Sequence, residues 1–91
     1  MTKVSREEVY KVIDGERAYQ DMRWNESTTP TGGFHTVPEF VLYMEHYLQE
    51  ARRLLSTQPD PKANEDGLDF VRKVTAMGVA CMEQNGAVER K

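Results

Sequence analysis

The sequence predicts a single all-α domain over residues 1–91, in which two helices form an antiparallel hairpin and an N-terminal helix packs across it. Two capping-box patterns, Ser5 to Glu8 and Thr36 to Glu39, each precede a run of apolar residues at helical spacing. Two segments rich in turn-forming residues, 25–34 and 56–62, divide the chain into three such runs.

The first helix is expected to begin at Arg6, because Ser5 can accept a backbone N–H while Glu8 reaches back to the cap. Its inward stripe begins with Val9, Val12 and Ile13. The same stripe then continues with Glu16, Gln20 and Trp24. The helix therefore changes from an apolar to a polar inner face along its length, which is typical of a protein that binds something there.

Residues 25–34 are predicted to form a loop, because they are rich in Ser, Thr, Pro and Gly. A loop of this length is a candidate binding element in a compact domain. The Gly32-Gly33 pair is typical of an ordinary turn, although its position before a helix N-terminus also suits an anion.

The second helix is predicted to follow Thr36, with Pro38 in its first turn, where a missing N–H leaves no bond unmade. It carries an unbroken apolar stripe at helical spacing: Val37, Phe40, Val41, Met44, Tyr47, Leu48, Ala51, Leu54 and Leu55. This pattern predicts its packing against the rest of the domain.

After a connector over 56–62, Asp60 is the expected N-cap and Pro61 the first residue of the third helix. This helix is expected to run to about Gln84, ended by Asn85-Gly86 in a left-handed C-cap. The residues on its predicted core side are Phe70, Val71, Val74, Met77, Gly78, Cys81 and Met82.

Small residues gather late in the third helix, at Ala76, Gly78 and Ala80, and Gly67 lies earlier in it. Glycine weakens a helix by about 1 kcal/mol relative to alanine, so it indicates close approach of a neighbour. That neighbour is either the second helix, a second subunit or, as the remaining alternative, a ligand. A chain of this length buries only about 60–65% of its unfolded surface, which favours a homo-oligomer.

Composition excludes several classes of function. The net charge of -3, with basic and acidic residues interspersed, argues against binding a nucleic acid polymer. No apolar run is long enough to cross a membrane, so no membrane partner is expected. Cys81 is the single cysteine, and with no signal peptide we expect a reducing cytoplasm, that of the host cell if the protein is encoded by a phage.

The sequence does not favour catalysis or metal binding. Cys81 falls on an apolar helix face, so it is expected in the core rather than as a nucleophile. His35 and His46 lack a further His or Cys at metal-ligand spacing. We therefore predict no catalytic residue, no metal ligand and no cofactor.

Polar and aromatic residues at the end of the first helix instead predict a ligand site between that helix, the glycine loop and the start of the second helix. Arg17 and Arg23 are the expected phosphate contacts, and Trp24 is the stacking surface. The alternative for the aromatic residues is that they belong to the core. The full set of predicted ligand-binding residues is Glu16, Arg17, Gln20, Arg23, Trp24, His35, Thr36 and Tyr43.

The pattern Glu16-Arg17-x-x-Gln20-Asp21-x-x-Trp24-Asn25, together with the small apolar run 74–83, resembles short phage and prophage proteins of the MazG-like type. This resemblance implies an all-α fold and Mg²⁺-dependent nucleotide pyrophosphohydrolysis by a cluster of carboxylates. In the corresponding stretches the chain has only Glu45, Glu50 and Asp69.

The reduced set of carboxylates favours a non-catalytic protein that binds a nucleotide-derived small molecule, although the enzyme question stays open. By analogy, such a phage protein sequesters a signalling nucleotide of a bacterial defence system such as CBASS or Thoeris. The alternatives are a divergent Mg²⁺-dependent MazG-like pyrophosphohydrolase and a phage interaction protein without a ligand.

Overall fold

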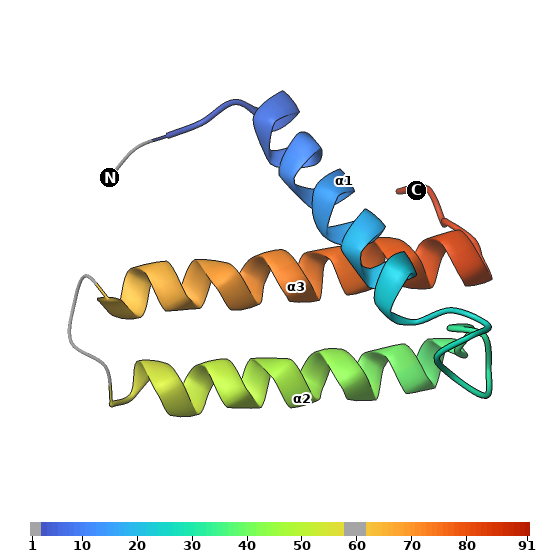
Figure 1. Cartoon of the computed structure of the whole chain (residues 1–91). Helices are drawn as coiled ribbons and strands as arrows, with labels where there is room; N and C mark the ends of the chain where they lie inside the picture. The colour runs from blue at the N-terminus through green and yellow to red at the C-terminus, as the bar shows by residue number, and fades with distance from the viewer. Residues whose placement is uncertain (1–2, 58–61) are drawn as a thin grey trace.

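The computed structural model describes residues 3–57 and 62–91, apart from the side chains of residues 62 and 63. It contains three helices within these ranges: α1 (Arg6–Arg23), α2 (Val37–Leu55) and α3 (Lys62–Asn85). The helices α2 and α3 run antiparallel as a hairpin, and α1 crosses α3 (Figure 1). The predicted all-α fold is therefore confirmed. The expected cap at Asp60 and first position at Pro61 lie outside the described residues.

Local capping chemistry sets the ends of the helices where the sequence predicted them. The Ser5 hydroxyl accepts the Glu8 N–H at 3.2 Å, and the Thr36 hydroxyl accepts the Glu39 N–H at 3.3 Å. The Glu39 carboxylate also accepts the Thr36 N–H at 2.8 Å, which completes the second capping box. Gly86 has a φ of 108° and donates its N–H to the Met82 carbonyl, so α3 ends at the predicted glycine.

The hydrophobic core is thin. Its buried apolar residues, within the part of the chain that the structure describes, are Ile13, Phe40, Ala51, Ala76 and Ala80. Many large apolar side chains are about half exposed instead, and the predicted core residue Cys81 is only partly buried. Three of the five buried residues are alanines, so burial within one chain contributes little hydrophobic stabilisation.

The small residues of α3 mostly serve packing within the chain. A methyl group placed on Gly67 would lie 3.3 Å from Leu55 Cδ2, so α2 approaches α3 closely there. At Gly78 the nearest atom would be Met44 Sδ, at 3.9 Å, which leaves room for a methyl group. Ala76 and Ala80 are buried. Packing against α2 thus explains Gly67, whereas overpacking by a small side chain is not expected at Gly78.

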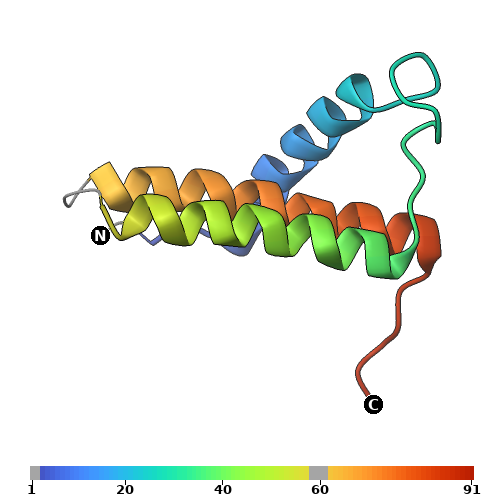
Figure 2. The same ribbon diagram turned by 90° about the horizontal axis from the view of Figure 1, so that it is seen from below.

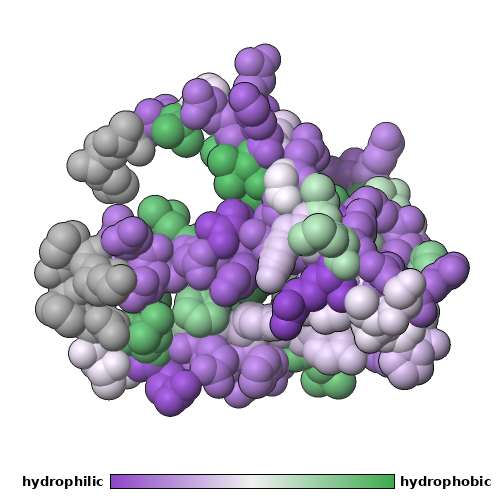
Figure 3. All heavy atoms as spheres, viewed as in Figure 1, coloured by the Kyte–Doolittle hydropathy of each residue, from purple (hydrophilic) through white to green (hydrophobic). Residues whose placement is uncertain are grey.

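The helix α1 packs on α3 but not on α2. It starts behind the hairpin, and its C-terminal half and the 24–36 loop project from one side of the hairpin (Figure 2). Near its start α1 also diverges from α3. The surface is hollowed there, with apolar residues such as Val9 and Leu68 at its border (Figure 3). The other end of α1, held on α3 by the buried Gln20, borders a second pocket, which is the candidate site.

Gly15 offers a test of how α1 is placed. A methyl group on Gly15 would have no atom within 4 Å in the described structure, and its backbone is helical. Gly15→Ala should therefore raise the free energy of unfolding by about 1 kcal/mol, because alanine loses less backbone entropy on folding. Urea denaturation followed by circular dichroism measures this. Destabilisation instead would indicate that another surface packs on Gly15.

Candidate functional site

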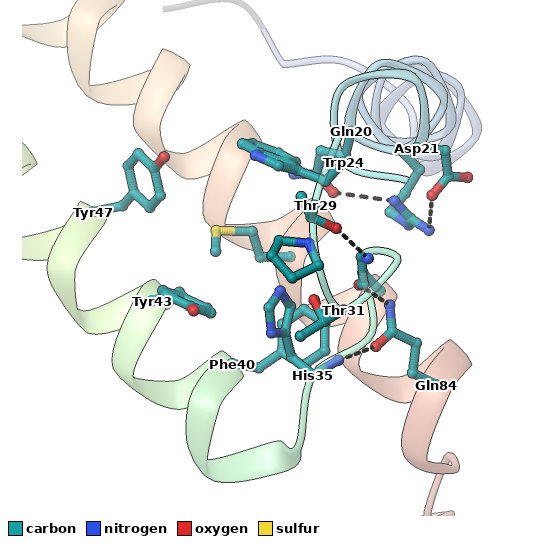
Figure 4. A pocket seen from close by; sticks show the side chains of 15 residues that line it. Gln20, Asp21, Trp24, Thr29, Thr31, His35, Phe40, Tyr43, Tyr47 and Gln84 are labelled. Atoms are coloured by element: carbon teal, nitrogen blue, oxygen red, sulfur yellow. Dashed lines mark hydrogen bonds and ion pairs between the residues drawn. The ribbon is translucent and has the colours of Figure 1, made fainter. Parts of the chain in front are cut away.

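A pocket of about 480 Å³ opens between the C-terminal end of α1, the 24–36 loop, the start of α2 and the second half of α3. Its residues come from all three helices and the loop, and their side chains converge on one space (Figure 4). They are Arg17, Gln20, Asp21, Trp24, Thr29, Pro30, Thr31, Gly33, His35, Phe40, Tyr43, Tyr47, Met77, Ala80 and Gln84. A volume of this size suits a small molecule.

Five aromatic rings form most of the wall of this pocket. Phe40 is buried, while Trp24 and Tyr43 are 43% and 44% exposed and so present ring surface to a ligand. The ring of His35 lies edge-on to Phe40 and Tyr43, with centroid distances of 5.6 and 5.1 Å. Edge-to-face contacts of this kind hold the rings in fixed orientations. The fifth ring is that of Tyr47.

Arg17 forms the polar end of the pocket, and it is already neutralised by carboxylates. Its Nε lies 2.7 Å from Glu83 Oε2, and one terminal nitrogen lies 2.9 Å from Asp21 Oδ1. Its side chain is only 12% exposed. Burial alone would lower the pKa of Arg17, but the hydrogen bonds and charges of Glu83 and Asp21 outweigh burial and raise that pKa. The guanidinium is therefore permanently charged and paired.

Gln20 connects this polar end to α3. It is the buried polar residue of the described chain, at 6% exposure. Its amide nitrogen donates to the Lys73 carbonyl at 3.4 Å, and its amide oxygen accepts from Arg17 at 3.2 Å. Because both ends of the amide are bonded, Gln20 positions Arg17 and α1 as well as lining the pocket.

The loop that covers the pocket is fastened to the end of α3. Gln84 Oε1 accepts the His35 N–H at 2.9 Å, and Gln84 Nε2 donates to the Gly33 carbonyl at 3.0 Å. Asn85 Nδ2 donates to the His35 carbonyl at 3.1 Å. Within the loop, the Thr29 hydroxyl accepts the Gly33 N–H at 2.8 Å. These bonds hold the pocket open without a ligand, so the site is preformed.

The positions proposed for an anion are already occupied by the protein's own groups. The N–H of Gly32 donates to the Thr29 carbonyl, and that of Gly33 donates to the Thr29 hydroxyl. Both glycines have positive φ, 68° and 84°, as a glycine turn requires. At the start of α2 the Glu39 carboxylate accepts a hydrogen bond from the Thr36 backbone, and this bond lowers the pKa of Glu39. The geometry is that of an ordinary turn and a self-capped helix.

Of the eight residues predicted to bind a ligand, the structure brings five to the pocket: Arg17, Gln20, Trp24, His35 and Tyr43. The other three point elsewhere. Glu16 turns to α3, where it accepts from Arg72 Nε at 2.7 Å. Arg23 lies 5.9 Å from the centre of the Trp24 ring, outside the pocket lining, and Thr36 caps α2.

Sequence reasoning missed most of the part of the site that α3 supplies. Met77 was assigned to the core, whereas Ala80 belongs to the small-residue surface for which a ligand was the remaining alternative. Gln84 had a detectable signal, because it is a polar residue that closes an apolar run just before the C-cap. Phe40 and Tyr47 were assigned to the core stripe of α2, and both also line the pocket.

One buried polar atom in this region lacks a partner. His35 Nδ1 is buried and makes no hydrogen bond to the residues that the structure describes. An unmade hydrogen bond of a buried group costs about 1–3 kcal/mol. His35 is thus a pocket residue with a buried, unused hydrogen-bonding atom, which either a water molecule or a ligand group can satisfy.

Two of the three acidic residues in the stretches that correspond to a magnesium site are used in ion pairs. Glu50 pairs with Arg53 at 2.8 Å on the outside of α2, and Asp69 pairs with Arg72 and Lys73 on α3. Among residues 3–57 and 62–91, no three His, Cys, Asp or Glu side chains gather in a way that would hold a metal ion. The absence of metal and cofactor stays a prediction.

Comparisons with protein families, with curated proteins and with solved structures give no match. The resemblance to MazG-like phage proteins and the phage origin therefore stay predictions. In the described part of the chain, every helix is too short or too polar to cross a membrane.

Proposed function

We propose that the protein binds, without chemical turnover, a small molecule that carries a nucleobase or a similar flat ring. The observation that supports this most directly is the set of five aromatic rings around a preformed pocket of about 480 Å³. Stacking of a base on such a ring contributes about 1–3 kcal/mol and requires only a flat face. The hydrogen-bonding edge of a base also suits His35, whose Nδ1 has no partner in the described chain.

The charge of the pocket bears on which part of a nucleotide enters it. Arg17 is balanced by Asp21 and Glu83, so the pocket lining offers no spare positive charge for a row of phosphates. Arg23 lies outside the pocket lining, with its guanidinium 5.9 Å from the centre of the exposed Trp24 ring. We therefore propose that an uncharged base enters and that any phosphate remains at the rim.

The biological role we propose is sequestration of a nucleotide-derived signal, as the resemblance to small phage proteins implies. Its support is the pocket, together with the use of Glu50 and Asp69 in ion pairs. Signal capture in defence systems of the CBASS or Thoeris type is the corresponding hypothesis, with the host cytoplasm as its location.

The single tryptophan makes the proposal testable by fluorescence, because Trp24 lines the pocket. Titration with adenosine, AMP, ADP-ribose and a cyclic dinucleotide should change its emission for at least one of them. By calorimetry, Trp24→Ala and Tyr43→Ala should each weaken that affinity at least about tenfold, the equivalent of 1.4 kcal/mol of stacking. Both side chains are exposed, so helical circular dichroism should persist.

Tyr19→Ala is the matched control. Tyr19 and Tyr43 are both 44% exposed, but Tyr19 does not line the pocket, so its removal should leave the affinity within about twofold. Loss of helical signal in Trp24→Ala would instead show that Trp24 belongs to the core. Release of pyrophosphate from nucleoside triphosphates with Mg²⁺ or Mn²⁺, abolished by Glu50→Gln, would favour the alternative enzyme.

A further inference from the structure

The side of the hairpin away from the pocket carries a row of half-exposed apolar side chains, which we call the back face. Their exposed fractions lie between 43% and 51%. The residues of the back face are Val41, Leu48 and Leu55 on α2 and Met82 on α3. The thin core makes this face significant, because it holds more large apolar side chains than the buried interior does.

Helix geometry places the back face opposite the pocket. Successive residues turn by about 100°, so residues seven apart, such as Val41, Leu48 and Leu55, form one row along α2. Met44 faces α3, near Gly78, and Tyr47 lines the pocket on the other flank of Met44. The same geometry puts Met82 on the flank of α3 away from Met77. Figure 2 shows the loop and the C-terminal half of α1 on one side of the hairpin, while the start of α1 passes behind the hairpin and the C-terminal tail lies on the other side.

The apolar residues of α2 also have the spacing of a helix–helix seam. Their positions alternate by four and three residues, as in a coiled coil. The residues are Val37, Val41, Met44, Leu48, Ala51 and Leu55. Within the chain α3 buries only Ala51 of this set below one-tenth exposure. A seam of this kind is complete when a second helix with the same spacing packs on it.

Two charges flank this row, and neither has an opposite charge beside it in the described chain. Glu45 accepts a hydrogen bond from the neutral Gln49 at 3.3 Å, and Arg52 is exposed with no ion pair among the residues described. By contrast, Glu50 and Arg53 pair with each other on another side of α2. Glu45 and Arg52 are seven residues apart, so they lie on the same flank of the row, three residues before and four residues after Leu48.

We infer that a second copy of this chain covers the back face, with the two α2 helices antiparallel about a two-fold axis near Leu48. In that register Leu48 meets Leu48 of the partner subunit, and Val41 meets Leu55 of the partner subunit. Glu45 then faces Arg52 of the partner subunit, and Arg52 faces Glu45 of the partner subunit at the symmetric position across the two-fold axis. Glu45 and Arg52 have opposite signs and lie three and four residues on either side of Leu48, so the two-fold axis brings each close to the other's counterpart in the partner subunit. This self-complementarity identifies a copy of this chain as the occupant, because a two-fold interface must complement itself. The pocket stays open on the far side of each hairpin.

Exchange of the two charges tests this inference independently of any ligand. The wild-type protein should be dimeric by light scattering at micromolar concentration. Glu45→Arg and Arg52→Glu should each raise the dimer dissociation constant at least about fivefold, because each places like charges together at two symmetric points. The double variant Glu45→Arg/Arg52→Glu restores opposite charges and should return the dissociation constant to within about twofold of wild type.

Arg53→Glu is the control, because Arg53 is exposed on another side of α2, and it should leave the dissociation constant within about twofold. Circular dichroism should show that all four variants are folded, because the altered side chains are exposed. The inference is wrong if the folded wild-type protein is still monomeric at about 100 micromolar, because even a weak dimer should form at that concentration. A double variant no tighter than the single ones, or single variants that dimerise as wild type does, would also overturn it.

Discussion

Replacing Gly33 with alanine should lower the free energy of unfolding by at least about 2 kcal/mol and should collapse the ligand pocket. Two effects combine at this residue. Its φ of 84° lies in the left-handed region, and a methyl group there would collide with the carbonyl oxygen of Trp24. A backbone oxygen cannot rotate away as a flexible side chain can. The loop must therefore move, which separates Gly33 from Gln84 and Thr29.

Gly86→Ala separates these two effects. Gly86 also has a positive φ, of 108°, but a methyl group there would meet no atom within 4 Å in the described structure. We expect it to cost only the backbone strain, about 1–2 kcal/mol. Urea denaturation gives both values, and Trp24 emission reports the loop directly. Equal costs at the two glycines would contradict the close approach of Gly33 to Trp24.

The boundaries of the helices could be predicted because they depend on neighbours in the sequence. A capping box needs only a hydroxyl and a carboxylate three residues apart, and Thr36 with Glu39 forms both of its bonds. Gly86 ends α3 for an equally local reason. The orientation of α1 was predictable only as a packing across the hairpin, because the contact that holds it involves residues distant in sequence.

The site was predictable in part for the same reason. The pairing of Arg17 with Asp21 follows from one turn of helix, but Glu83 lies 66 residues away along the chain and had no local signal. The assignment of Arg17 as a spare cation for phosphate was therefore incomplete. Burial of Gln20 agrees with the polar inner face of α1, whereas Glu16 on the same stripe found a partner in Arg72.

Thr36 shows a conflict that the sequence already contained. A capped helix N-terminus was predicted to attract an anion, yet the same capping box supplies the Glu39 carboxylate. Once that carboxylate bonds the Thr36 N–H, the N-terminus has its own negative charge, and a phosphate there would be repelled. Capping and anion binding at one helix end compete for the same few N–H groups.

Arg17→Gln should produce the second large effect, a loss of about 1–2 kcal/mol in the free energy of unfolding. The Arg17 side chain joins α1 to α3 through Glu83, bonds Asp21 and Gln20, and is only 12% exposed. Its removal leaves Asp21 and Glu83 close to each other without a balancing charge. Glu83→Gln should cost less alone, because Glu83 is 51% exposed and Arg17 keeps Asp21. The double variant should cost less than the sum of the two, as expected for residues in contact.

The same variant also decides what part of a ligand the pocket holds. If an uncharged base enters, the loss of Arg17 changes affinity only through the geometry of the polar end, and Arg17→Lys keeps most of the binding. If phosphate is the group recognised, Arg17 must leave its carboxylates to bind it. In that case Arg17→Gln abolishes the binding of AMP, and adenosine, which has no phosphate, does not bind even to the wild-type protein. Calorimetry with adenosine and AMP on folded wild-type and Arg17→Gln protein separates the two cases. Tighter binding of AMP than of adenosine, by more than about tenfold and lost in Arg17→Gln, would contradict the proposal that the base occupies the pocket.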